Sequence, residues 1–163
     1  MKFSKKQLIG PIVFALLVVI LDQITKALVV RHIPFGAQVP VIPGLVHLTY
    51  VRNAGAAFSM LSGMRWLFLA LVAVFFVTVV LMVKRGLVDR PTQLWCLAAI
   101  GGGAVGNAID RAISGTVVDM IEVEFVRFAV FNVADSFITC GAIVLIVFLF
   151  FFDRKEPRHD PEG

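Results

Sequence analysis

The sequence predicts an all-α integral membrane protein with four transmembrane helices, a small extracytoplasmic β-sheet and a short interfacial helix. Three observations support this fold class. The 163-residue chain is 59% hydrophobic and only 16% charged, a balance that soluble domains rarely show. Four apolar runs are long enough to cross a bilayer. Two longer connections, rich in β-branched residues, separate these runs on one side of the membrane.

The four apolar runs have about 18 to 20 residues each, and a helix of this length crosses about 30 Å of hydrocarbon. Helices are required because a bilayer offers backbone N–H and C=O groups no other partner. The run after the basic N-terminus is too long for a signal peptide and has no small-residue cleavage site, so we predict an uncleaved span. We expect one membrane-embedded domain, with spans at residues 11–30, 66–83, 94–113 and 134–152.

Basic residues indicate the orientation of these spans. Nine of the 15 lysines and arginines fall in the N-terminal segment, the loop at 84–93 and the polar tail at 153–163. The other six are diluted over the opposite side, which carries the long connections at 31–65 and 114–133. Because cytoplasmic segments carry an excess of positive charge, we predict that both termini are cytoplasmic.

The two long connections contain short β-like runs. Residues 45–51 are β-branched and partly alternating, and residues 115–125 also resemble a strand, with polar residues recurring at Asp119, Glu122 and Glu124. Together they predict a small sheet on the outer membrane surface. Residues 54–61 are predicted to form the short interfacial helix.

Polar side chains collect near the outer ends of the spans. They come from three spans and both connections: Asp22, Lys26, Asn53, Asn107, Asp110, Arg111, Asp119, Asn132 and Asp135. The inner halves of the spans have almost no ionisable residue. Ionisable groups are costly in a membrane and usually face a partner or a cavity. This common depth predicts a functional site near the outer leaflet.

Most of these residues also have a simpler structural interpretation. Asp22 and Lys26 are four residues apart and can pair along one helix face. Asp110 and Arg111 can mark the interfacial end of a helix. Gly106, with Gly102 four residues before it, is typical of close helix packing.

Asp119 and Asp135 are the central pair of this prediction. Alone, Asp135 is a candidate N-cap of the fourth helix, and Asp119 is a polar residue on the wet face of a strand. If the two carboxylates lie within a few Å, repulsion and desolvation leave them one shared proton. The ionised member can accept a proton from water while the protonated member polarises a peptide carbonyl. The pair therefore predicts peptide hydrolysis without a metal or a covalent intermediate.

Other chemistries lack the required patterns. The three histidines are scattered, and no His-Glu-x-x-His or Gly-x-Ser-x-Gly motif occurs, so we expect no metal and no cofactor. Cys96 and Cys140 fall in apolar runs and are predicted to be small buried residues. No basic stripe indicates nucleic acid. The main alternative is a small proton- or ion-coupled carrier, because intramembrane charges also mark ion paths.

Four stretches, in order, give the chain a resemblance to bacterial lipoprotein signal peptidase, also called signal peptidase II. They are DQITK at residues 22–26, NAGAAFS at 53–59, GNAIDR at 106–111 continuing through GTVVD at 115–119, and FNVADS at 131–136. The resemblance implies an inner-membrane aspartyl endopeptidase that removes the signal peptide of prolipoproteins. It implies cleavage just before a diacylglyceryl-modified cysteine, with Asp119 and Asp135 as the catalytic pair.

The resemblance also implies supporting residues and partners. Family positions that shape the site or contact substrate correspond to Asp22, Asn53, Asn107, Arg111, Asn132 and Ala134, and we add Lys26, Gly106 and Asp110 from the same stretches. The implied partners are lipid-modified prolipoproteins, membrane lipid and globomycin-type inhibitors. The implied location is the bacterial inner membrane, with the site at the outer, periplasmic leaflet. We expect a monomer.

Overall fold

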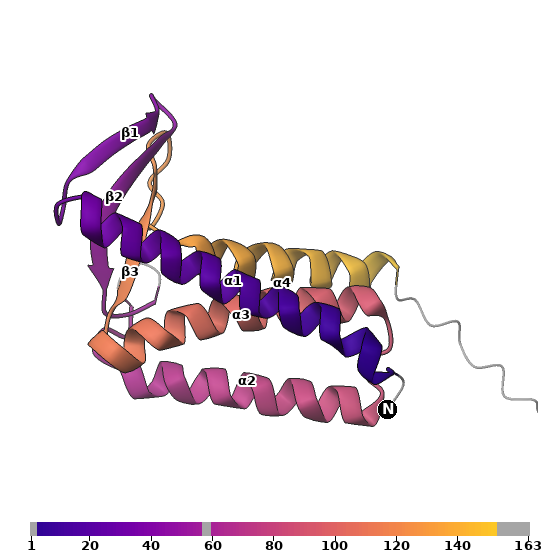
Figure 1. Ribbon diagram of the computed structural model, residues 1–163. Helices are drawn as coiled ribbons and strands as arrows, with labels where there is room; N and C mark the ends of the chain where they lie inside the picture. The colour runs from indigo at the N-terminus through magenta and orange to yellow at the C-terminus, as the bar shows by residue number, and fades with distance from the viewer. Residues whose placement is uncertain (1–2, 57–59, 153–163) are drawn as a thin grey trace, which may run out of the picture.

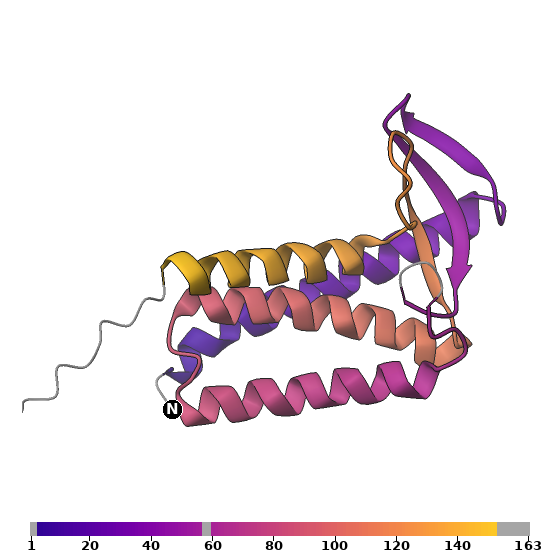
Figure 2. The same cartoon turned by 180° about the vertical axis from the view of Figure 1, so that it is seen from behind.

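The computed structural model describes residues 3–56 and 60–152. The axes of its helices are roughly aligned, and a small sheet stands at one end of them (Figure 1). The start of α1 and the end of α4 lie at the opposite end (Figures 1 and 2). The helices are α1 (Lys5–His32), α2 (Arg65–Arg85), α3 (Pro91–Ser114) and α4 (Val133–Phe151). They coincide with the four predicted runs, apart from shifts at the ends.

The largest shift in helix bounds is at α1, which begins at Lys5 and not near residue 11. Ser4 starts the helix with a reciprocal capping box. Its hydroxyl accepts the backbone N–H of Gln7 at 3.4 Å, and the Gln7 side chain accepts the Ser4 N–H at 2.8 Å. The capping residue Ser4 is polar and precedes the apolar run. Hydropathy alone therefore placed the start of α1 too late.

The helices turn apolar side chains outward. In α2, not one residue is buried, and Trp66 and Val77 are more than half exposed. Leu16 of α1 and Ile146 of α4 are exposed in the same way. Helices α1, α2 and α4 are long and apolar enough to cross a membrane. Such a continuous apolar surface suits lipid and not water.

Helix α3 packs through its glycines against two neighbours. A side chain at Gly102 would collide with α1 at Val18, and one at Gly103 would collide with the backbone oxygen of Ala134 in α4. The predicted role of the small residues in helix packing is therefore confirmed. The same glycines and the polar end of α3 make it less apolar than the other three helices.

Replacing Gly103 with alanine is expected to lower the free energy of unfolding by about 1–3 kcal/mol, because the added methyl group overpacks the contact with α4. Chemical unfolding in detergent micelles measures this loss. Gly101→Ala is the matched control, since its methyl group would meet only the Phe75 and Phe76 rings at 3.4 Å. Equal stability of the two variants would contradict the packing argument.

The sheet has the order β1-β2-β3, with antiparallel pairing throughout. Its strands are β1 (Gln38–Ile42), β2 (Val46–Asn53) and β3 (Val117–Val123). Strands β2 and β3 occur where the sequence predicts them. Strand β1 was not predicted, because Pro40 lies within it and Pro43 directly follows it. Proline is tolerated in β1 because this is an edge strand, where one side of the ladder needs no N–H donor.

A small apolar core fixes the sheet to the end of α1. It consists of Val29, Tyr50 and Met120, one residue from each of α1, β2 and β3. The register between β2 and β3 places Val51 opposite Asp119 and Asn53 opposite Val117. The sheet thereby holds Asn53 and Asp119 close to the helix ends.

Two predictions concern residues beyond the helices and strands. Of the predicted interfacial helix at 54–61, residues 57–59 lie outside the described residues, and the neighbouring ones form bends and turns. The predicted polar tail, 153–163, also lies outside them. Cys96 is buried as expected, but the prediction for Cys140 was wrong: this thiol is exposed and lines a cavity between helices.

Candidate active site

A cavity of about 740 Å³ lies between α2, α3 and α4. Both Asp119 and Asp135 line it, together with Asn107 and Arg111. Asn107 and Arg111 lie toward the C-terminal end of α3, Asp119 lies in β3, and Asp135 lies in the first turn of α4. The remaining wall is apolar and reaches deeper along the helices, through residues such as Phe68, Leu71, Phe75, Ile100, Ala104 and Ile138. The cavity is therefore mostly apolar, with two carboxylates at one end.

Asp135 lies in the first turn of α4 and takes part in its cap. The Asn132 side chain accepts the Asp135 N–H at 2.9 Å, and Asp135 Oδ2 accepts the Asn132 N–H at 3.2 Å. The other oxygen, Oδ1, accepts an N–H of the Asn107 amide at 2.7 Å. Asp135 therefore takes part in the cap of α4 and also lines the cavity. The capping role predicted from sequence is compatible with a role in the site.

Asp119 lies in β3 and is only 2% exposed, so the wet strand face considered for it from sequence is wrong. Its Oδ1 accepts an N–H of Asn132 at 2.7 Å, and its Oδ2 accepts an N–H of Asn53 at 3.0 Å. Asn53 is oriented by the Gly55 N–H, which donates to its carbonyl at 2.9 Å. Asn132 contacts both aspartates and so links strand β3 to helix α4.

Burial raises the pKa of Asp119 from 3.8 to about 6. Desolvation is the largest cause, the Asn53 hydrogen bond opposes it, and the negative charge of Asp135 adds to it. A carboxyl group of this kind retains its proton closer to neutral pH than an exposed aspartate does. It can then act as a proton donor.

This raised pKa predicts how stability depends on pH. Between about pH 4 and pH 6 the folded chain holds a proton on Asp119 that the unfolded chain has already released. Raising the pH through this window should therefore destabilise the fold, by on the order of 2 kcal/mol. Chemical unfolding in micelles at several pH values should show a smaller fall in the free energy of unfolding for Asp119→Asn than for the wild type as the pH rises.

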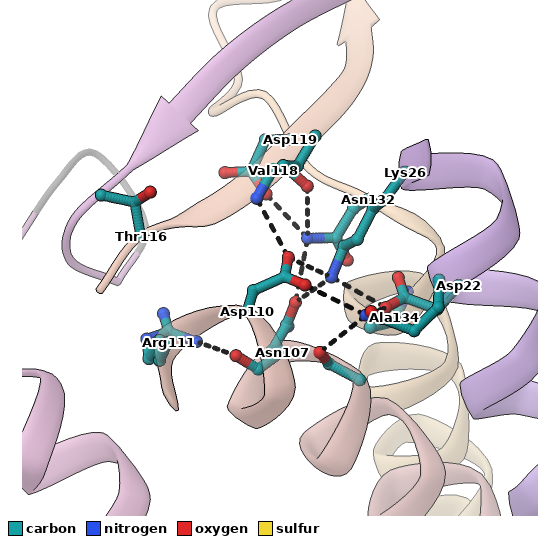
Figure 3. Close-up of polar contacts among 12 residues, drawn as sticks. Asp22, Lys26, Asn107, Asp110, Arg111, Thr116, Val118, Asp119, Asn132 and Ala134 are labelled. Atoms are coloured by element: carbon teal, nitrogen blue, oxygen red, sulfur yellow. Dashed lines mark hydrogen bonds and ion pairs between the residues drawn. The ribbon is translucent and has the colours of Figure 1, made fainter. Parts of the chain in front are cut away.

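A buried ion cluster of Asp22, Lys26 and Asp110 lies next to Asn107 (Figure 3). Lys26 Nζ contacts Asp22 at 2.8 Å and Asp110 at 2.9 Å, and it donates to the Asn107 carbonyl at 2.9 Å. The predicted pair between Asp22 and Lys26 is confirmed and proves to be part of a larger group. Asp110 is not a simple interfacial charge, because it closes this cluster from α3.

Gln23 belongs to this cluster and was not among the predicted site residues. Its side-chain N–H groups lie 3.0 Å from Asp110 Oδ1, 3.1 Å from the Gly106 carbonyl and 3.2 Å from Asp22 Oδ2. Asp110 also accepts the Val118 N–H at 3.1 Å, directly before Asp119. Adjacent helix positions usually diverge in direction, so helical spacing did not predict that Gln23 joins Asp22, although Gln23 lies within the DQITK stretch.

Asp22 also fixes the start of α4. Its Oδ1 accepts the Ala134 N–H at 3.0 Å, one of the free donors of the first helical turn. Any side chain at Gly106 would collide with the Asp22 carboxylate. Ala134 and Gly106 therefore contribute by being small and letting the backbones approach.

Arg111 connects the cavity to the loop after β2. Its Nη2 donates to the Gly55 carbonyl at 2.7 Å, and its guanidinium lies 4.4 Å from the centre of the Phe68 ring. Arg111 therefore holds the loop that directly follows Asn53. All the site residues predicted from sequence meet at this end of the helices, from three helices, two strands and the cap of α4.

The fold and the site define a class: an integral membrane protein of apolar helices, with a carboxylate-lined cavity at one end. The chain matches the model of the family described as signal peptidase (SPase) II over residues 14–151, and it belongs to this family. It is thus a membrane-embedded peptidase.

Relatives and solved structures agree with this assignment. The chain is 41% identical over 141 residues to a lipoprotein signal peptidase of Brevibacillus brevis, covering 86% of this chain and 95% of that one. It is 44% identical over 135 residues to the Streptococcus pyogenes serotype M6 enzyme of the same name, covering 82% and 88%. A solved bacterial membrane enzyme, 33% identical, superposes with a TM-score of 0.82 over 91% of this chain and 94% of that one. A second, also 33% identical, gives 0.78 over 88% and 95%.

Proposed function

We propose that the protein is an aspartic endopeptidase that cleaves the signal peptide from diacylglyceryl-modified prolipoproteins, just before the lipidated cysteine. The observation that carries this proposal is the pair Asp119 and Asp135. Both line the polar end of the cavity, and Asn132 links them. Membership of the signal peptidase II family supports the substrate class.

The two aspartates can hydrolyse an amide without a covalent intermediate. The ionised carboxylate accepts a proton from water as the water oxygen attacks the scissile carbonyl carbon. The protonated carboxyl gives its proton to the carbonyl oxygen, so that a tetrahedral diol forms. The first carboxyl then passes its new proton to the amide nitrogen while the C–N bond breaks. The diol returns a proton to the second carboxylate, and the pair is restored.

The shape of the cavity fits such a substrate. Its apolar wall reaches along the helices from the carboxylates, through residues such as Leu71 and Ile100. An apolar signal segment or an acyl chain can lie against this wall, and the scissile bond then falls at the polar end. Globomycin-type peptides would inhibit by occupying the same end.

We further propose that all four helices span the bacterial inner membrane, in one monomeric domain. Helix α3 lies among three helices that are apolar enough to cross a bilayer. Lys84, Arg85 and Arg90 lie at the end away from the sheet, which favours a cytoplasmic location for that end. Both termini are then cytoplasmic, and the aspartates lie at the outer leaflet.

The test uses the purified full chain in detergent micelles. It is given a prolipoprotein with and without the diacylglyceryl group, and the products are weighed by mass spectrometry. We expect cleavage just before the modified cysteine and none of the unmodified protein. A folded protein that leaves both substrates intact would contradict the proposal. If the same protein then moved protons across liposomes, a small carrier would be the better reading.

A further inference from the structure

Lys26 uses all three of its N–H donors inside the buried cluster. Two are directed at the carboxylates of Asp22 and Asp110, at 2.8 and 2.9 Å, and the third at the carbonyl oxygen of Asn107, at 2.9 Å. An ammonium has three donors, so none remains for another partner. Lys26 itself is only 3% exposed, and Asp22 is fully buried.

This contact fixes the amide of Asn107 in one orientation. Its oxygen accepts from Lys26 and also from Asn132 Nδ2, at 3.1 Å. A flipped amide would place its NH₂ against two donors and its oxygen against the Asp135 carboxylate. The NH₂ of Asn107 must therefore face Asp135, to which it donates at 2.7 Å.

The donors around Asp135 favour its ionised form. One is the Asn107 amide, which the charge of Lys26 polarises. The other is the Asn132 backbone N–H at the N-terminus of α4, where the helix dipole favours a negative charge. Arg111 is a second cation; it interacts with both aspartates, and more with Asp135 than with Asp119.

Asp119 has a different environment. Among the described residues it accepts from the neutral amides of Asn53 and Asn132, and it lies on a strand, where no helix dipole acts. Burial affects both aspartates, so the donors around them distinguish the two environments. The charged groups facing the pair are Asp22 and Lys26 from α1 and Asp110 and Arg111 from α3.

We propose that Asp135 enters the reaction as the carboxylate and Asp119 as the acid, and that Lys26 is the positioning residue that sets this order through Asn107. The proposal rests on the proposed function only in taking these two aspartates as the reacting pair. In the reaction, Asp135 accepts the proton of water and later gives it to the leaving amine nitrogen. Asp119 gives its proton to the carbonyl oxygen and regains one when the diol collapses.

Nuclear magnetic resonance of the wild-type protein tests the order directly. The chain is labelled with ¹³C at the aspartate carboxyl carbons and titrated in micelles. Each signal is assigned by its loss in the matching Asp→Asn variant. We expect the main change of the Asp119 signal at a pH about one unit or more above that of Asp135. The reverse order would overturn the assignment.

A charge-neutral variant tests the part played by Lys26. In Lys26→Met/Asp110→Asn the Asn107 amide loses its cation, and the gap between the two titrations should shrink by about one pH unit. Asp110→Asn alone keeps the contact between Lys26 and Asn107 and should not shrink the gap. Lys26→Gln, which retains a donor but no charge, is the second variant. A residue with a purely structural role would leave the difference between the Asp119 and Asp135 titrations unchanged. An unchanged difference in either Lys26 variant would therefore overturn the positioning role.

The outcome is separable from that of the cleavage assay, because the titration needs no substrate. If the wild type failed to cleave the prolipoprotein while the titration order held, the proposed substrate would be wrong and the proton assignment right. If cleavage occurred and the order were reversed, only the inference about Lys26 and the two aspartates would fail.

Discussion

Cleavage of the diacylglyceryl prolipoprotein is expected to fall by about 10³-fold or more when either Asp119 or Asp135 is replaced with asparagine. Each carboxyl transfers a proton in the reaction, and general acid–base groups contribute about 10²–10⁴-fold to such rates. Asparagine keeps the shape and one acceptor of aspartate, so Asn107 can still donate to residue 135 and Asn132 to residue 119. The new NH₂ group faces the second donor of each site, the Asn132 backbone N–H or the Asn53 amide, and this contact costs about 1–3 kcal/mol of stability. The loss of cleavage should appear in kcat and should exceed what the folded fraction, measured under the assay conditions, explains.

The control for this experiment is Glu124→Gln, a carboxylate that is exposed near the sheet. It should cleave at the wild-type rate. Undiminished cleavage by either the Asp119 or the Asp135 variant would rule out the dyad. Loss of cleavage together with loss of the folded state would be a stability effect, and the unfolding temperature distinguishes the two cases.

The largest loss of stability is expected for Asn132→Ala. Asn132 is fully buried, caps α4 through the Asp135 N–H, and donates to Asp119 and Asn107. Losing the cap costs about 1 kcal/mol, and leaving Asp119 Oδ1 without its donor costs about 1–3 kcal/mol, whereas the Asn107 oxygen keeps Lys26. We therefore expect the free energy of unfolding to fall by about 3 kcal/mol, and cleavage to be lost as well. Chemical unfolding in micelles measures the first effect.

Ser4→Ala provides the matched control, because Ser4 also caps a helix with a capping box but is exposed to solvent around its contacts. Removing that cap should cost about 1 kcal/mol and leave cleavage unchanged. Similar losses in the two variants would show that Asn132 acts only as a helix cap. The account requires a larger loss, because Asn132 also joins strand β3 to helix α4.

Much of the helical frame could be predicted from the sequence, because spans depend on local hydropathy. The runs at 66–83, 94–113 and 134–152 each correspond to a helix with ends within a few residues. Strand β1 could not, because Pro40 weakens the local strand signal and only pairing with β2 makes the segment extended. The start of α1 depends on the Ser4 cap, which hydropathy does not register.

The residues that meet at this end of the helices could be predicted from their similar positions along the apolar runs. The contacts between them could not. Spacing indicated the pair of Asp22 and Lys26, since both lie on one helix face. The contacts of Lys26 with Asn107 and Asp110 join α1 to α3 over more than 80 residues, and no local pattern encodes them. The burial of Asp119 likewise depends on how β3 packs over the helix ends.

The central claim is that water attacks the scissile carbonyl between Asp119 and Asp135. The most direct measurement is a crystal structure of the protein with a lipopeptide in which a hydroxyl-bearing carbon replaces the scissile carbonyl. The account predicts that this hydroxyl lies within hydrogen-bond distance of both carboxylates, with the apolar part of the ligand along the wall formed by α2, α3 and α4. A ligand whose hydroxyl contacts neither aspartate would contradict it.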